Sequence, residues 1–133
     1  MSREETAAVV ARFVEATDKY DLEVLRELVH PDLRYIIPAA LPNGGVMHGA
    51  KAFLDMMGKL GDFYRPESMS IERDPPIIDD GRAALPFTLT ATTANGKPYF
   101  NRYVMVVHVK DGQLTEIDEH LDTRYLSQRM YGD

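Results

Sequence analysis

The last strand-like segment of the chain, residues 112–122, carries an acidic residue among apolar ones. Side chains of a β-strand alternate between two faces, so Glu119 shares its face with Ile117 and Leu121. Desolvating a carboxylate is costly unless it is paired, hydrogen-bonded or protonated. Burial moves a carboxyl pKa toward ~6–7, where the group can act as a general acid or base. Glu119 is therefore the first catalytic candidate; the alternatives are a structural carboxylate, or Asp122 in its place if the strand bulges.

The preceding strand-like segment, residues 99–109, has a face of similar mixed character. Asn101, Tyr103 and Met105 alternate along it, which places hydrogen-bonding groups among apolar side chains, as in small-molecule pockets. Asn101 and Tyr103 are candidates to donate hydrogen bonds to a substrate carbonyl or enolate oxygen. The alternative is that they satisfy each other or Glu119. Further pocket residues are expected from the other strands, and these are Tyr35, Ile37 and Phe87.

The four histidines are scattered, without the His-x-His or His-Glu-x-x-His spacing of metal sites, so no metal site is expected. His48 precedes an expected helix, and histidine is a residue type that can bind ligands or move protons near neutral pH, so it is either a ligand-binding residue at a cavity mouth or an ordinary loop histidine. The chain has no Cys, which excludes disulfides, thiol nucleophiles and cysteine zinc sites. It also has no Gly-x-Ser-x-Gly motif and no phosphate-binding loop, and we expect no cofactor.

The totals describe an ordinary folded chain. Its 133 residues are the length of a single domain, expected to span 1–133. The net charge of −6 argues against a nucleic-acid partner, which requires a basic surface. No apolar run approaches the ~20 residues that span a bilayer, and the charged N-terminal residues do not resemble a signal peptide. We therefore expect a cytoplasmic protein without a membrane partner.

Hydrophobic periodicity predicts the elements that position these residues. The expected helices are 3–18, 22–29, about 49–61 and 123–130. The expected strands are 33–37, 67–80 with a break at Pro75-Pro76, 83–93, 99–109 and the final segment, with a loop at 38–48. Asn95-Gly96 and Asp111-Gly112 predict hairpins between the last three strands. Helices come first and strands last, which indicates an α+β fold.

Several short motifs follow one another in a distinctive order. They are Ala8–Val14, Tyr20-Asp21-Leu22, His30–Leu33, His48-Gly49, and Asp111-Gly112 followed by Glu119–Thr123. This order resembles the nuclear-transport-factor-2-like (NTF2-like) superfamily, and within it the SnoaL-like polyketide cyclases and the ketosteroid isomerases. The resemblance implies a cone-shaped, curved antiparallel sheet wrapped around N-terminal helices, with an apolar cavity and a homodimer formed through the sheet.

The resemblance does not extend to every catalytic position. Where ketosteroid isomerases carry their general base this chain has Ile37, and where they carry an oxyanion-hole tyrosine it has Phe13. Both therefore become expected ligand-binding residues. The Arg-x-Asp of limonene-epoxide-hydrolase-like members is missing from 83–93. In SnoaL-like cyclases a carboxylate reaches the cavity from the last strand, and Glu119 matches it.

These expectations combine into one function. The chain is expected to be a cofactor-free acid/base enzyme of SnoaL-like type, a cyclase, isomerase or dehydratase, acting on a small apolar carbonyl-bearing ligand. Glu119 would move the proton, while Asn101 and Tyr103 would stabilise the oxyanion. The alternative is a non-catalytic ligand-binding or assembly module of the same fold.

Overall fold

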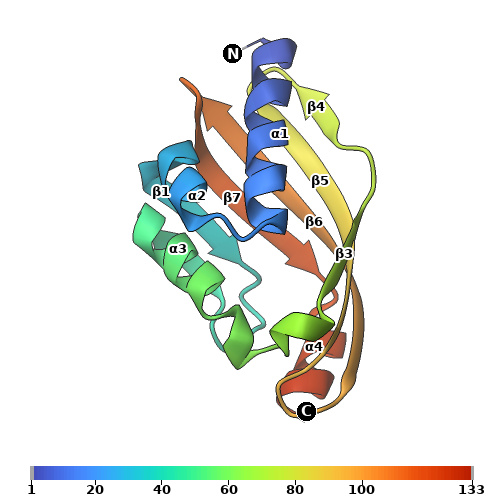
Figure 1. Ribbon diagram of the computed structural model, residues 1–133. Coiled ribbons are helices and arrows are strands. Elements are labelled where there is room, and N and C mark those ends of the chain that lie inside the picture. Colours follow the sequence, from blue (N-terminus) through green and yellow to red (C-terminus); the bar gives the residue numbers. More distant parts are fainter. Residues whose placement is uncertain (1, 133) are drawn as a thin grey trace.

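A computed structural model describes residues 2–132, which form a curved sheet with helices on one side of it (Figure 1). The helices are α1 (Arg3–Asp18), α2 (Leu22–Leu28), α3 (Ala50–Gly58) and α4 (Thr123–Met130), with short 3₁₀ turns η1 (Leu60–Asp62) and η2 (Pro66–Ser68). The strands are β1 (Val29–Ile37), β2 (Gly45–His48), β3 (Ser70–Arg73), β4 (Ile77–Asp79), β5 (Arg82–Thr92), β6 (Pro98–Lys110) and β7 (Gln113–Leu121). The expected α+β fold class is confirmed.

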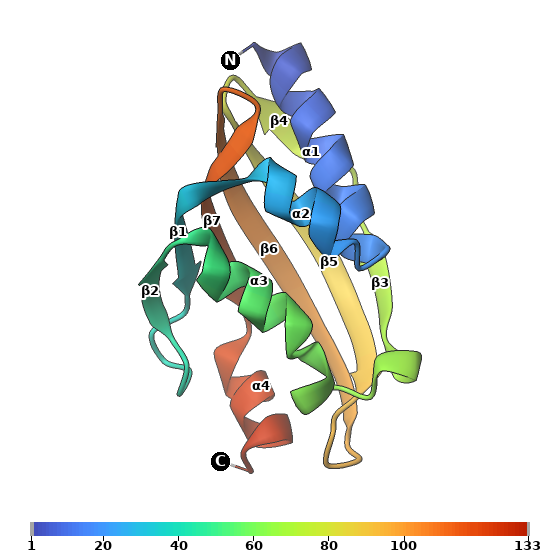
Figure 2. The same cartoon turned by 60° about the vertical axis from the view of Figure 1, so that its left-hand side comes forward.

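The sheet runs in the order β2-β1-β7-β6-β5-β3, and β4 pairs with the other part of the β5 edge. It curves around α1, α2 and α3, and α4 closes the end where the chain terminates (Figure 2). Neighbouring strands are antiparallel except β1 and β7, which are parallel. The expectation of an antiparallel sheet missed this pair, because β1 and β7 lie at opposite ends of the sequence and no hairpin joins them.

Local sequence signals account for most element boundaries. Ser2 and Glu5 form a reciprocal capping box at the start of α1. Asp21 caps α2, and Asp122 caps α4 by accepting a hydrogen bond from the Tyr125 backbone N–H at 3.0 Å. The break at Pro75-Pro76 separates β3 from β4, as predicted. Helix α4, which closes one end of the site, is thus anchored directly after the last strand.

The segment 38–48 differs from its prediction as a simple loop, because its last four residues form β2 and pair with the end of β1. β1 also begins earlier than predicted, with Val29 in the strand rather than in the helix. The register of the β6–β7 pair shifts between His108 and Val109 of β6, which leaves Thr115 of β7 as an extra residue. This bulge buries both Leu114 and Ile117, and regular alternation resumes beyond it toward Glu119.

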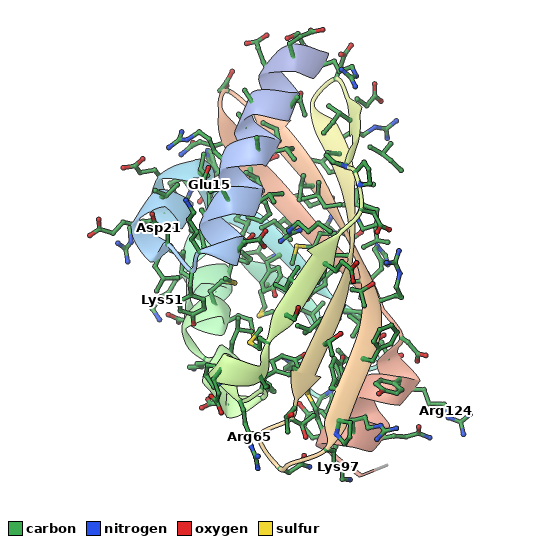
Figure 3. The ribbon with its side chains drawn as sticks, turned by 45° about the vertical axis from the view of Figure 1, so that its right-hand side comes forward. Glu15, Asp21, Lys51, Arg65, Lys97 and Arg124 are labelled. Carbon is green, nitrogen blue, oxygen red and sulfur yellow. The ribbon has the colours of Figure 1, made fainter. Side chains whose placement is uncertain are left out.

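The hydrophobic core lies between the helices and the inner face of the sheet. Phe13 of α1 is fully buried and packs against Phe53 of α3, with ring centroids 6.1 Å apart. The Phe53 and Tyr35 rings in turn form a T-shaped pair, with centroids 5.3 Å apart. Charged side chains such as Asp21 and Lys51 lie on the outside of the molecule (Figure 3). Among residues 2–132, no helix has the length and apolar character needed to cross a membrane.

Candidate active site

A cavity of about 720 Å³ lies between the inner face of the sheet and helices α1, α3 and α4. Its walls are mainly apolar and aromatic, which suits a small, largely apolar ligand. The sheet contributes Tyr35, Ile37, Phe87, Tyr103, Met105 and Glu119. The opposite wall includes Phe53, Met56, Met57, Tyr64, Leu126 and Met130.

Glu119 carries its carboxyl group into this cavity from β7, opposite Met105 on β6. Glu119 lies inside the molecule but is only partly buried, because its side chain lines the cavity. Burial raises the pKa of Glu119 from its ordinary value of 4.5 to about 7, while a hydrogen bond from the Tyr35 hydroxyl acts in the opposite direction. A carboxyl group with such a pKa both accepts and releases a proton at neutral pH.

A chain of tyrosine hydroxyls lies beside Glu119. The Tyr103 hydroxyl is 3.1 Å from that of Tyr64 and 2.7 Å from that of Tyr99, and Asn101 Nδ2 donates to the Tyr99 hydroxyl at 2.9 Å. Burial raises the pKa of Tyr64 and of Tyr103, so both phenols stay protonated. The Tyr103 ring stacks on Phe87 with centroids 4.9 Å apart, which fixes the orientation of the phenol.

The structure brings six of the sequence-predicted site residues together around one cavity. They are Tyr35, Ile37, Phe87, Tyr103, Met105 and Glu119. Asp122, the alternative to Glu119, is engaged as the cap of α4 and does not line the cavity. Of these two acids, it is therefore Glu119 that faces the cavity.

Asn101 is buried on the expected face of β6 but does not line the cavity. Its Nδ2 donates to the Asp122 carbonyl oxygen at 3.0 Å and to Tyr99, and its Oδ1 accepts from the Arg102 backbone N–H at 2.9 Å. Both N–H groups of the amide are thus occupied within the protein. The expectation that Asn101 binds a substrate oxygen directly is corrected by this arrangement.

Two expected ligand-binding residues also lie outside the cavity. Phe13 of α1 is fully buried in the core and packs against Phe53, which does line the cavity. His48 is exposed, because it lies opposite Arg34 in the β1–β2 pair, and opposite residues share a face of the sheet. Arg34 is on the outer face, where it forms an ion pair with Glu116. His48 therefore faces outward.

Tyr64 lines the cavity and was not among the predicted site residues. It lies in the irregular segment between η1 and η2, anchored by an isolated bridge to Thr93 at the end of β5. Neither helical nor strand periodicity applies to such a segment. Its sequence signal is limited to the adjacent aromatic residues Phe63-Tyr64 directly after the third helix.

The rim of the cavity carries an ion pair that the sequence reasoning also missed. Arg73 of β3 binds Asp18 of α1 through Nε and Nη2, at 2.9–3.1 Å, and also donates to the Thr17 hydroxyl. The guanidinium lies over the Phe87 ring, 5.1 Å from its centroid. This contact ties the sheet edge to α1. Of the two carboxyl groups that line the cavity in the described part of the chain, Asp18 is thus paired with Arg73, and Glu119 forms no ion pair.

Within residues 2–132 no group of three or more His, Asp or Glu side chains is arranged to hold a metal ion. Besides the Arg73–Asp18 ion pair, Thr17 and Asn43, the polar groups of the cavity are the Glu119 carboxyl and a set of phenols. Their chemistry is proton transfer and hydrogen bonding to oxygen.

Comparison with known families now places the chain. A model of the SnoaL-like domain matches residues 10–117. The chain belongs to the SnoaL-like family. No curated protein matches it in sequence.

Solved structures show the same fold for this SnoaL-like domain. An NTF2-like protein of unknown function from Burkholderia pseudomallei superposes with a TM-score of 0.84 at 22% identity, over 98% of both chains. A candidate SnoaL-like polyketide cyclase from Jannaschia reaches 0.81 at 14% identity, over 98% of this chain and 94% of the other. A candidate isomerase from Rhodopseudomonas palustris reaches 0.77 at 20% identity, over 94% and 97%. The NTF2-like cone expected from the sequence is confirmed.

Proposed function

We propose that this SnoaL-like domain is an acid/base enzyme that moves a proton next to the carbonyl group of a small, largely apolar compound. The observation that carries the proposal is the Glu119 carboxyl, which reaches a mainly apolar cavity and forms no ion pair, and whose pKa is raised by burial to about 7. A carboxyl group in this state is matched to proton transfer at neutral pH.

The proposed step takes a proton from the carbon next to the carbonyl group. The ionised Glu119 carboxylate accepts this proton, and the electron pair left on carbon moves to the carbonyl oxygen to form an enolate. Tyr35, which donates a hydrogen bond to the carboxylate, holds it in place. Return of the proton to another atom gives isomerisation, while attack by the enolate carbon on a second carbonyl group gives cyclisation. The names of the cyclase and isomerase neighbours agree with this reaction class.

The proposal is tested without knowing the natural substrate. β-Tetralone is a bicyclic aromatic ketone with acidic hydrogens next to its carbonyl group, and proton NMR in D₂O follows their replacement by deuterium. We expect the protein to accelerate this exchange, with a rate that rises with pH as Glu119 ionises through pH ~7. Exchange no faster than in buffer, for β-tetralone and for a panel of similar ketones, would count against the proposal.

A second candidate function is binding without turnover. It is favoured by Ile37, an apolar residue at the position where the isomerases of this superfamily carry their base, at the wall of the same cavity. In this case apolar ketones bind, as measured by calorimetry, while the exchange rate stays at that of buffer.

We also propose that two copies pair through the outer face of the sheet. Phe100 on β6 is 61% exposed there, and Val104 follows on the same face of that strand. The substitutions Phe100→Glu and Val104→Glu are expected to shift the protein from dimer to monomer in sedimentation equilibrium. Ile77→Glu on β4, 66% exposed at the sheet edge, is the matched control and should leave the dimer intact. A wild-type monomer at all concentrations contradicts this pairing.

A further inference from the structure

Helix α1 ends in a backbone arrangement that favours glycine. The Asp21 N–H donates to the Ala16 carbonyl oxygen at 2.8 Å. The Tyr20 N–H donates to the Thr17 carbonyl oxygen at 3.2 Å. These two bonds form a Schellman motif, in which the residue after the C-cap adopts a left-handed backbone conformation. That residue is Tyr20, with a φ of 58°. For a bulky residue this conformation disfavours the folded state by roughly 5–30-fold.

The Tyr20 side chain has few contacts within the protein that offset this strain. Within residues 2–132 its hydroxyl forms no hydrogen bond and its ring pairs with no other aromatic ring or cation. The residue is 44% exposed. It does, however, line the cavity. Strained backbone positions of this kind cluster at ligand-binding and active sites, so the strain at Tyr20 points to a role of its ring in the cavity.

Tyr20 lies at the opening of the cavity, beside the ion pair at its rim. The Asp18 side of this pair precedes Tyr20 by two residues. On the other side, Ile71 precedes Arg73 by two residues on the same face of β3. Ile71 is also exposed, and it lines the cavity like Tyr20. Both side chains therefore present apolar surface where a ligand would cover it, and covering it is favourable.

This opening is distant from the acid/base group. In the sheet, β5 and β6 lie between β3 and β7, which carries Glu119. Neighbouring strands are ~4.8 Å apart, so the opening beside β3 lies roughly 14 Å from β7 along the sheet. A two-ring ketone such as β-tetralone is shorter than this span. The cavity of about 720 Å³ has room for a longer molecule.

We propose that Tyr20 is a ligand-binding residue that makes the site selective for elongated ketones. The aromatic ring of Tyr20 packs against the end of the ligand that lies at the opening, while the carbonyl group lies at Glu119. This inference rests on the proposed function of the cavity and adds the length of the ligand to it. The contact is apolar packing by the ring and does not involve the Tyr20 hydroxyl.

The test compares β-tetralone with 6-benzyloxy-β-tetralone, which extends the same ketone by a further aromatic ring. Calorimetry measures the Kd of each, and the wild type is expected to bind the extended ketone more tightly. Tyr20→Ala should weaken binding of the extended ketone by about five- to tenfold, because the ligand can no longer bury the exposed part of the ring. Binding of β-tetralone should change little. Tyr20→Phe keeps the ring and should bind both ketones like the wild type.

Tyr20→Gly tests the strain. Gly and Ala both lack the ring, but only Gly adopts the left-handed conformation freely, so Tyr20→Gly should have a several-fold smaller unfolding equilibrium constant than Tyr20→Ala. Both should bind the extended ketone equally weakly. Among residues 2–132, Asp111 is the other non-glycine residue with a positive φ, and it does not line the cavity. As the matched control, Asp111→Gly should also be more stable than Asp111→Ala, with both Kd values unchanged.

A Tyr20→Ala or Tyr20→Gly variant that is folded by thermal unfolding and binds the extended ketone as tightly as the wild type overturns the inference. So does a wild type that prefers β-tetralone or binds neither ketone. The inference and the proposed enzymatic function fail separately. Without accelerated deuterium exchange, but with binding that depends on the Tyr20 ring, the enzymatic function fails and the role of Tyr20 stands. With exchange that depends on Glu119, but binding indifferent to Tyr20, the reverse holds.

Discussion

Replacing Glu119 by Gln is expected to slow the deuterium exchange of β-tetralone by ~10²–10⁴-fold, which is the usual contribution of a general acid or base. The Gln side chain has nearly the same shape and its amide oxygen still accepts from Tyr35, but it cannot carry the proton. Binding of the ketone should change little, so the loss falls on the rate constant rather than on KM. Proton NMR under saturating ketone measures it.

Asp118→Asn is the matched control for this experiment. Asp118 precedes Glu119 on β7 and faces the other side of the sheet, where it contacts His120 at 3.2 Å. The Asp118→Asn substitution removes one carboxylate charge from the same strand but changes no residue that lines the cavity. The exchange rate of this variant should therefore equal that of the wild type. Equal rates for Glu119→Gln and the wild type would exclude Glu119 as the acid/base residue.

The same Glu119→Gln substitution is expected to stabilise the protein at alkaline pH. The folded state holds the Glu119 proton up to a pKa of about 7, whereas the unfolded chain releases it around 4.5. Between these values the folded state binds more protons, so the wild-type free energy of unfolding falls as pH rises through this window. The full effect is about 3 kcal/mol, reached above the folded-state pKa. The Glu119→Gln variant has no carboxyl group at this position, so its free energy of unfolding does not fall with pH for this reason.

Urea unfolding at about pH 5 and about pH 8 measures this effect, since the two conditions lie near the two ends of the titration window. The stability advantage of Glu119→Gln over the wild type should be small at the acidic pH and grow to its full size at the alkaline one. Glu67→Gln, at an exposed carboxyl in η2, is the control and should show no such divergence. An advantage that does not grow with pH would mean that burial does not raise the Glu119 pKa. Active sites commonly reduce the stability of the folded state in this way, because a buried acid/base group is needed for function.

Strand alternation located Glu119 because β7 is regular where it matters. The bulge at Thr115 shifts the register upstream, and beyond it Ile117, Glu119 and Leu121 follow the simple two-residue period. A bulge between Glu119 and Asp122 would have turned Asp122 toward the inner face as well. Alternation is thus informative over a single uninterrupted strand and carries no information about where a bulge lies.

Alternation gives the face of a residue and not its depth along the cavity. Asn101 and Tyr103 share the inner face of β6, as expected, yet the Asp122 backbone and Tyr99 occupy the amide of Asn101 near the end that α4 covers. The cavity ends between these two residues. Its extent depends on how α4 packs against β6, which no local pattern in the sequence specifies.

Tyr64 and His48 show the two limits of single-sequence reasoning in the irregular segments. Tyr64 reaches the cavity because one bridge to Thr93 fixes an otherwise aperiodic segment. His48 faces outward because residues 45–48 pair with β1, in a segment whose Pro and Gly content favoured a loop. Both outcomes depend on contacts between residues far apart in the chain.

The central claim is that Glu119 is a desolvated, poised acid/base group, and its pKa tests this most directly. ¹³C NMR of the side-chain carboxyl carbons, with Glu119→Gln to assign the signal, follows its titration. We expect a midpoint near 7, and a still higher one in Tyr35→Phe, because loss of the Tyr35 hydrogen bond removes a group that lowers the pKa of Glu119. A midpoint at or below ~4 would show a stabilised structural carboxylate and would contradict the account.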